Sequence, residues 1–314
     1  MLRRKVDIKS FQKVLLVHNH NAGKQSFFSG IHKNVDTIAK RLLQTYGAER
    51  FHYVEVGTFA AAQAAGRRIC EEKVDWVIVA GGDGTLRALV EVCVEHDYWP
   101  YVSVYPAGTV NLVAKELMLR TDVNNWMFQI SKGVTLPVCL GKANDRIFLT
   151  VVGIGVDSMV VKQVTPQEKK YLSTLAYVRQ SGKVVGQEML LHNWKYKFQV
   201  MIDNEGIWRD ASSVIVTKSR YYAGRFSLVN GSSISNPALH VCLFTKDKCV
   251  DFLRYTALIA ADMLSLDKSV EIYPAKQVEI RCNVKKFAAE LDGDAVVESP
   301  LSISLLPRPL QFIS

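Results

Sequence analysis

The chain has 314 residues, 48% of them hydrophobic, and a formal net charge of +9. This length and apolar content allow a large core and favour two domains over one. The apolar stretches are short and interrupted by charge, and the basic first residues lead to no apolar signal core, so we expect neither a transmembrane helix nor secretion. The six cysteines form no C-x-x-C pair, which predicts reduced thiols without a disulfide frame or a zinc site.

From Phe11 to about Lys132 the sequence alternates between strand and helix patterns. The expected strands cover residues 14–17, 51–56, 75–80 and 101–105, and the expected helices cover 34–46, 60–72, 86–94 and a segment from about 112. This alternation predicts a doubly wound, mostly parallel α/β domain over residues 1–133.

The pattern changes near Gly133, where short strands separated by turn residues begin. The expected strands cover residues 134–138, 146–152, 196–202, 214–218, 239–244, 269–273 and 278–282, and two helices are expected at about 166–185 and 249–264. Such spacing predicts an antiparallel β-sandwich domain over residues 134–305. A last strand is expected at 310–313.

The most informative segment is the turn Gly81-Gly82-Asp83-Gly84-Thr85, which joins an apolar strand to a helix. Glycines remove side chains at such a turn, so a phosphate can lie against backbone N–H groups and the helix N-terminus. An acidic residue among them suits a metal ion or a hydroxyl that loses its proton. Taken alone, the segment is also compatible with a simple tight turn.

Two further strands end in polar, glycine-containing turns, at Asn19–Lys24 and at Pro106–Asn111. Three such loops share the carboxyl edge of one parallel sheet, where open α/β sheets bind ligands. Lys24 is a candidate phosphate-facing cation, although a surface lysine is more often solvated. The residues expected to cradle the nucleotide are Asn19, Gly23, Gly81, Gly82, Gly84, Thr85 and Thr109.

The motifs Asn-x-x-Ala-Gly-Lys, Gly-Gly-Asp-Gly-Thr and Pro-x-Gly-Thr-x-Asn, in this order, resemble the catalytic domain of the diacylglycerol kinase family. That family includes sphingosine and ceramide kinases and bacterial soluble lipid kinases. The resemblance continues through segments 148–157, 220–224 and 291–294. The third motif, followed by Leu-Val-Ala, is most similar to the bacterial branch.

The resemblance implies ATP and Mg²⁺ as cofactors, a lipid acceptor held between the domains, and a C-terminal segment 306–314 that returns to the first domain. It also implies that Thr58 contacts ATP, although an ordinary helix N-cap explains this threonine equally well. The matching motif positions Asn21, Gly108 and Asn111 are included among the expected nucleotide-binding residues.

Three acidic residues are the catalytic candidates: Asp83, Asp292 and Asp294. The resemblance implies that Asp294 is the proton acceptor, but the family has a glutamate there, one methylene longer. A general base works within about 2.6–3.2 Å of its proton donor, so the shorter side chain shifts the acceptor, recruits a water or leaves the role to Asp83. Asp83 and Asp294 are also the candidates for contact with the magnesium of ATP.

Several positions allow other interpretations. The Asp-Gly pair at 292–293 is a strong hairpin signal, and a hairpin can also deliver a carboxylate to a site. Arg87, close to the second loop, is a candidate for an additional phosphate clamp. Asn236 stands where many bacterial relatives have an aspartate that binds a structural magnesium, so we do not expect that accessory site here.

These observations favour an ATP-dependent lipid kinase that transfers the γ-phosphate to a diacylglycerol-like or sphingoid-like hydroxyl. A kinase of a soluble hydroxyl, similar to NAD kinases, is an alternative because it shares the Gly-Gly-Asp-Gly-Thr type of loop. A catalytically impaired nucleotide-binding regulatory protein is another, supported by Asp294 and Asn236. The β-rich second half and the third motif favour the lipid.

The basic net charge of the chain bears on which partners the protein binds. No nucleic-acid module is visible and the Lys and Arg residues are spread along the chain, so we expect no nucleic-acid partner. Basic charge suits contact with an acidic membrane, although a simply basic surface explains it equally well. We expect a cytoplasmic protein that is peripheral to the inner face of the membrane, with a homodimer as a further option.

Overall fold

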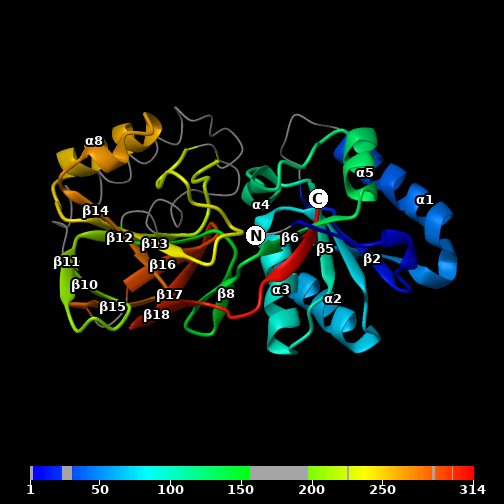
Figure 1. Cartoon of the computed structure of the whole chain (residues 1–314), viewed down its shortest axis with the longest axis horizontal. Coiled ribbons are helices and arrows are strands. Elements are labelled where there is room, and N and C mark those ends of the chain that lie inside the picture. The colour runs from blue at the N-terminus through cyan, green and yellow to red at the C-terminus, as the bar shows by residue number, and fades with distance from the viewer. Residues whose placement is uncertain (1–2, 23–29, 156–196, 225, 285–286, 299) are drawn as a thin grey trace. The chain divides into compact units, whose positions relative to one another are not determined.

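The computed structural model describes residues 3–22, 30–155, 197–224, 226–284, 287–298 and 300–314 (Figure 1). The chain divides into two compact units, Met1–Leu140 with Pro307–Ser314, and Gly141–Leu306. The helix expected at 166–185 lies outside the described residues. Among the helices that are described, none has the length and apolar content needed to cross a membrane.

The first unit is built on a seven-stranded sheet in the order β1-β6-β19-β5-β4-β2-β3. Its parallel part consists of β2 (Val14–Asn19), β3 (Phe51–Val56), β4 (Trp76–Gly81) and β5 (Tyr101–Pro106). Strands β2, β4 and β5 are almost entirely buried, as parallel strands covered on both faces are. The predicted α/β architecture is confirmed, and the three polar turns follow the carboxyl ends of neighbouring strands.

The other part of this sheet is formed by segments far apart in the sequence. Strand β19 (Leu310–Ile313) lies between β5 and β6 (Val134–Val138), parallel to β5 and antiparallel to β6, and β1 (Arg4–Lys5) pairs with β6. Residues 134–138, which the sequence placed at the start of the β-rich domain, therefore belong to the first sheet. Local alternation predicts a strand but does not determine which sheet it joins.

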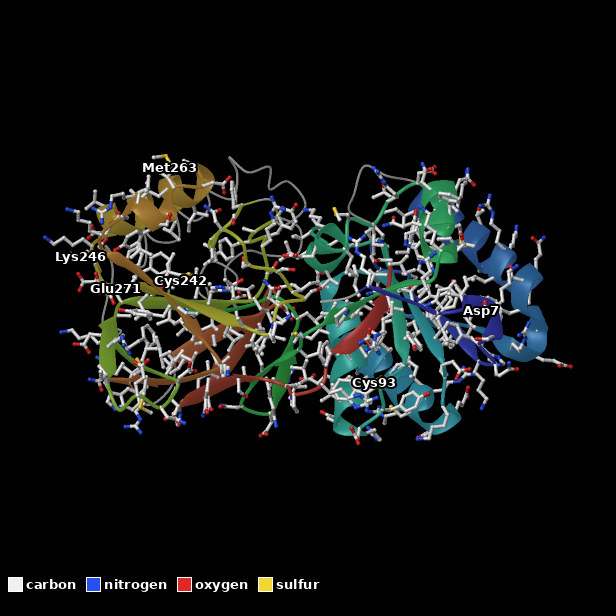
Figure 2. All side chains as sticks on the ribbon, in the orientation of Figure 1. Asp7, Cys93, Cys242, Lys246, Met263 and Glu271 are labelled. Carbon is white, nitrogen blue, oxygen red and sulfur yellow. The ribbon has the colours of Figure 1, made fainter. Side chains whose placement is uncertain are left out.

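Helices cover both faces of this sheet. Side chains alternate along β4, so Ile78 packs with residues of α1 (Ile31–Arg50) and α5 (Val123–Ser131). Val77 and Val79 gather instead with apolar residues of α2 (Phe59–Glu72) and α3 (Asp83–Glu95). Cys93 of α3 belongs to this buried layer (Figure 2). A short helix, α4 (Leu112–Glu116), follows the third polar turn.

The second unit is a β-sandwich, as the sequence predicted. One six-stranded sheet has the order β11-β10-β15-β18-β7-β8 and the other β14-β13-β12-β9-β16-β17, with antiparallel pairing throughout the described strands. The strands are β7 (Gly141–Ala143), β8 (Arg146–Phe148), β9 (Val151–Ile154), β10 (Phe198–Ile202), β11 (Trp208–Ala211), β12 (Ser213–Thr217), β13 (Leu239–Phe244), β14 (Val270–Ala275), β15 (Gln277–Cys282), β16 (Phe287–Leu291), β17 (Asp294–Glu298) and β18 (Leu301–Leu305).

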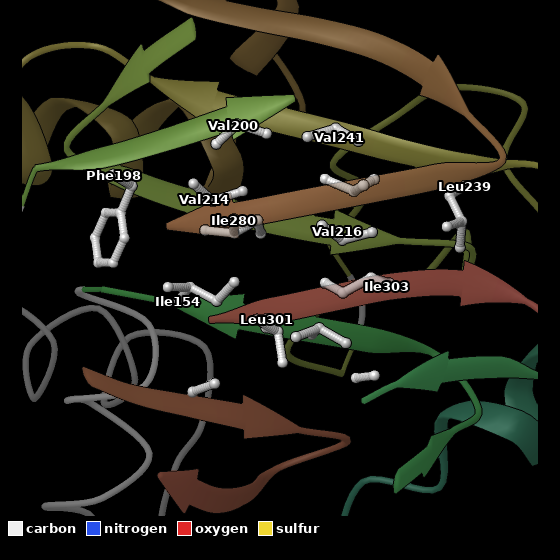
Figure 3. Packing of buried hydrophobic residues seen from close by; sticks show 14 of the residues in the cluster. Ile154, Phe198, Val200, Val214, Val216, Leu239, Val241, Ile280, Leu301 and Ile303 are labelled. Atoms are coloured by element: carbon white, nitrogen blue, oxygen red, sulfur yellow. The ribbon is translucent and has the colours of Figure 1, made fainter. Parts of the chain in front are cut away.

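Apolar side chains from both sheets form the sandwich core (Figure 3). Val214 and Val241 of one sheet and Ile280 and Ile303 of the other are fully buried in this cluster. The opposite face of β12 and β13 packs against α8 (Cys249–Ala260), where Tyr255 is also buried. The sandwich thus has an apolar interior between its sheets and one face covered by a helix.

Candidate active site

The second polar turn places an uncapped helix N-terminus at the edge of the first sheet. Gly82 is the N-cap of the 13-residue α3, and no side chain among the described residues caps it through a hydrogen bond. The first N–H groups of a helix lack partners within the helix and carry partial positive charge. Thr85, in the first turn, is 8% exposed. This end of α3 can therefore accept an anionic ligand.

The second and third turns touch each other through two glycines. A Cβ atom added to Gly108 would lie 2.5 Å from the Cα of Gly82 and 2.7 Å from Oδ1 of Asn111. The third turn is closed by Asn111, whose Oδ1 accepts from the Gly108 nitrogen (3.0 Å) and whose Nδ2 donates to the Gly108 oxygen (2.7 Å). Only glycine fits at position 108, and the two turns present bare backbone on this side.

The first turn is fixed to the second by side-chain amides. Nδ2 of Asn19 donates to the Thr85 hydroxyl (2.8 Å), and Oδ1 of Asn19 accepts from the Asn21 nitrogen (3.0 Å). Nδ2 of Asn21 donates to the Gly57 oxygen (2.8 Å). Three predicted residues are thereby brought together, whereas Gly23 and Lys24 lie outside the described residues.

Asp83 holds the start of the next helix. Its Oδ2 accepts from the Leu112 nitrogen (2.8 Å) and its Oδ1 from the Val113 nitrogen (3.1 Å). These are orphan donors of the first turn of α4. In the structure Asp83 ties α4 to the N-terminus of α3, and its role as a proton acceptor or metal contact stays a prediction.

Three other predicted positions lie around these turns. Thr58 is exposed, and its hydroxyl accepts a hydrogen bond from the Ala61 nitrogen (3.1 Å). It is therefore the N-cap of α2, one of the two interpretations of this threonine. Thr109 is exposed in the third turn. Arg87 is only 2% exposed, with its guanidinium carbon 5.3 Å from the ring centroid of Phe59. Arg87 is thus buried between α2 and α3, and its suggested role as a phosphate clamp stays a prediction.

The second unit carries the acidic turn between β16 and β17. Asp292 and Gly293 have φ angles of 51° and 87° and form the two-residue loop of a hairpin, as an Asp-Gly pair predicts. The Asp292 carboxylate accepts from the nitrogen atoms of Leu149 (2.6 Å), Thr150 (2.7 Å) and Val151 (3.1 Å), and from the Thr150 hydroxyl (2.6 Å). These four hydrogen bonds fix the turn.

Asp294 differs from its neighbour in exposure. It is the first residue of β17, lies opposite Leu291 in the hairpin, and is exposed. Asp294 is thus the more exposed of the two carboxylates in this turn.

Two buried charged residues behind this turn were missed in the sequence. Lys218 has 0% exposure and donates from Nζ to the Leu149 oxygen (2.6 Å). Glu290 is 2% exposed and accepts at Oε2 from the Gly293 nitrogen (2.6 Å). A charge inside an apolar strand run is the signal that could have found both, because burying a charge is costly unless it is bonded.

A hydrogen-bonded chain lies beneath the first turn. The Tyr53 hydroxyl donates to Oε1 of Glu55 (2.8 Å) and lies 2.7 Å from Nδ1 of His18, so it accepts the His18 proton. Nε2 of His18 then accepts from Nδ1 of His32 (3.2 Å). Burial first, and the neighbouring His32 second, lower the pKa of His18 below its ordinary value of 6.5. His18 immediately precedes Asn19 and is held neutral.

Among the described residues, the acidic side chains do not gather into a metal centre. In the part of the chain that the structure describes, no group of three or more His, Cys, Asp or Glu side chains could hold a metal ion. Asn236 is exposed and its Nδ2 donates to the Gly231 oxygen (3.4 Å).

Two family models match the chain. The diacylglycerol kinase catalytic domain matches residues 13–143, and the YegS C-terminal NAD kinase beta sandwich-like domain matches residues 150–314. A "Putative lipid kinase" of Streptococcus pneumoniae serotype 4 (strain ATCC BAA-334 / TIGR4) is 26% identical over 282 residues, 88% of this chain and 92% of that protein. A diacylglycerol kinase of Bacillus subtilis (strain 168) is 23% identical over 287 residues, 90% of each chain.

The fold also has solved counterparts. A crystal structure of a "putative diacylglycerol kinase" from Bacillus anthracis str. Sterne superposes with a TM-score of 0.78 and 23% sequence identity, over 99% of this chain and 96% of that chain. At this identity the likeness shows the fold alone.

Proposed function

Because the chain belongs to the diacylglycerol kinase catalytic-domain family and carries its YegS-type C-terminal domain, we propose that it is an ATP-dependent lipid kinase. The reaction moves the γ-phosphoryl group of ATP to a hydroxyl of a diacylglycerol-like or sphingoid-like lipid. The contact between Gly82 and Gly108 carries the proposal, because it leaves bare backbone of two loops beside the N-terminus of α3. Such a site suits a phosphate chain.

The loops fit ATP by their donor chemistry. In the proposal the phosphates lie against the first N–H groups of α3, near Gly82 and Gly84, where the helix dipole favours negative charge. Asn19 and Thr85, joined by their side chains, keep the first turn beside this helix end. Asp83 acts here by holding α4 and the third turn in place.

Magnesium is a separate question. Both Asp83 oxygens accept backbone donors, and the described residues offer no cluster of three metal-binding side chains. Magnesium in kinase sites is usually held by substrate phosphates, waters and one or two carboxylates. We therefore propose that the ion enters with ATP, and we assign no step of the reaction to it.

The acceptor hydroxyl must lose a proton as its oxygen bonds to phosphorus. We assign this proton to the exposed carboxylate of Asp294, while Asp292 orients the turn through its four hydrogen bonds. ADP leaves with the electron pair of the broken phosphorus–oxygen bond. General-base help of this kind contributes about 10²–10⁴-fold in rate.

The test is phosphoryl transfer by the full chain. The protein is incubated with γ-labelled ATP and Mg²⁺, with diacylglycerol and sphingoid bases in mixed micelles and, separately, with sugars and NAD. We expect label only in the lipid extract. Label only in water-soluble products would support the NAD kinase-like alternative, and ATP binding without transfer to any acceptor would support the regulatory one.

A further inference from the structure

A small apolar surface stands out on the first unit. Met118, just after α4, is 67% exposed, and Phe128 on α5 is 65% exposed. Phe128 lies on the side of α5 opposite Trp126, which is completely buried. Soluble proteins expose single apolar residues routinely, so this pair needs a second observation before it indicates a partner.

Hydrogen bonds join the two segments that carry these residues. Nε2 of Gln129, next to Phe128, donates to the Met118 oxygen (3.3 Å), and its Oε1 accepts from the Arg120 nitrogen (3.2 Å). The segment that follows α4 is thereby held against α5. We call this surface the Phe128 patch, defined by Lys115, Met118, Arg120, Phe128 and Lys132.

The charge around the patch has one predominant sign. In the fully described stretch 107–133, the exposed charged residues are Lys115, Arg120, Lys132 and a single acid, Asp122. The Asp122 carboxylate accepts from the Asn125 nitrogen (2.9 Å) and caps α5. Nζ of Lys132 lies 4.5 Å from the Phe128 ring centroid. One cation therefore lies against Phe128, and the exposed charges of this stretch are mainly positive.

We propose that the Phe128 patch docks the protein on an anionic bilayer. Aromatic and thioether side chains suit the boundary between headgroups and acyl chains, while flanking lysines and arginines reach acidic headgroups. A stable protein interface buries about 1,200–2,000 Å² in total, far more than two side chains provide. The small size of the patch suits weak, reversible attachment to lipid.

The patch is also continuous with the nucleotide loops. Lys115 lies on α4, whose first N–H groups are held by Asp83, and Val110 of the third turn is 39% exposed. Docking would bring the third turn to the lipid surface. This inference rests on the proposed lipid kinase function, since an acceptor dissolved in a bilayer requires the enzyme to visit it.

Vesicle sedimentation tests the proposal. Vesicles of phosphatidylcholine alone are compared with vesicles of equal parts phosphatidylcholine and phosphatidylglycerol, across a salt series. The wild type should prefer the mixed vesicles and release as salt rises, because charges are screened within about 10 Å at 0.1 M ionic strength. Phe128→Ser should weaken binding about tenfold, and Lys132→Gln about fivefold.

Matched controls lie in the second unit. Ile207→Ser removes an apolar side chain that is 56% exposed, and Lys246→Gln removes an exposed cation, labelled in Figure 2. Both should bind vesicles as the wild type does. Weakening by Ile207→Ser or Lys246→Gln as large as that of the patch variants would overturn the proposal, as would wild-type binding by the patch variants.

Measurements of turnover on two lipid substrates can test the docking inference separately from the proposed kinase function. Phe128→Ser and Lys132→Gln should lose activity on vesicle-borne lipid but keep it on a short-chain, water-dispersed lipid. If the wild type phosphorylates neither lipid, the proposed function fails. If the wild type phosphorylates both lipids, two results would overturn the docking inference alone. In one, the variants keep wild-type activity on vesicle-borne lipid. In the other, their activity on the short-chain lipid falls as much as their activity on vesicles.

Discussion

Oδ2 of Asp83 lies 2.8 Å from the backbone nitrogen of Leu112. The acidic residue of the second turn thus holds the first turn of the helix that follows the third turn. Motif residues 29 positions apart in the chain form one structural unit, in which a carboxylate fixes the loop geometry that a nucleotide would meet.

Asp83→Asn should therefore reduce stability as well as ATP affinity. The new amide keeps one acceptor oxygen but turns an NH₂ group toward a backbone N–H, and an unsatisfied buried donor costs about 1–3 kcal/mol. Urea unfolding and ATP titration measure the two effects. Asp145→Asn is the control, since its side chain is 101% exposed. Unfolding of Asp83→Asn at wild-type urea concentration, with turnover lost, would instead place Asp83 in the chemistry.

Gly108→Ala should abolish ATP binding. Its methyl group would lie 2.5 Å from the Gly82 Cα, so the second and third turns must separate. Gly30→Ala is the matched control, because a Cβ there meets nothing within 4 Å. Isothermal titration with ATP compares the two. Wild-type affinity in Gly108→Ala would show that contact between the turns is not needed for the nucleotide.

Substitution of Asp292 should affect mainly stability, whereas substitution of Asp294 should affect mainly turnover. Asp292→Asn breaks part of a network of four hydrogen bonds and should lower the free energy of unfolding by about 1–3 kcal/mol. Asp294→Asn should unfold like the wild type, lose turnover and keep its affinity for ATP, as expected of a group used in the transition state. Loss of ATP binding in Asp294→Asn would make this residue a nucleotide ligand.

Stability should fall in mild acid because His18 is buried neutral. Its folded-state pKa lies below 6.5, so the unfolded chain binds more protons and the free energy of unfolding decreases as pH falls through 6.5. Burial lowers the pKa of His240 in the same direction. His18→Asn keeps a donor for Tyr53 but cannot titrate, so its stability should depend less steeply on pH. His52→Asn is the control, and an equal loss of slope in both variants would contradict the assignment.

Much of the fold followed from local patterns. The buried runs of β2, β4 and β5 and the polar turns after them stand where the sequence predicted them. The partners of 134–138 were not predictable in this way, because the strand pairs with 310–313, far away in the chain. Alternation of apolar residues indicates that one face of a strand is buried. It does not indicate which other strand or helix covers that face.

The candidate site shows the same limit at the level of side chains. Residue types indicated which groups could carry chemistry, but Asp83 and Asp292 are bound by backbone donors that no motif specifies. Arg87 stands beside the expected phosphates in the sequence but is buried between helices, because its direction depends on the phase of α3. Hydrogen-bond geometry shows which carboxylates are already bound by backbone donors.

The place of β19 between β5 and β6 determines when the first sheet can close during translation. Until residue 313 leaves the ribosome, the nascent α/β unit lacks an interior strand, whose Ile313 oxygen accepts from the buried Ser103 hydroxyl (3.0 Å). The whole of Gly141–Leu306 is synthesised before that moment. Domains usually mature from the N-terminus onward, but here we expect the sandwich to fold first and the nucleotide-binding unit to be completed last.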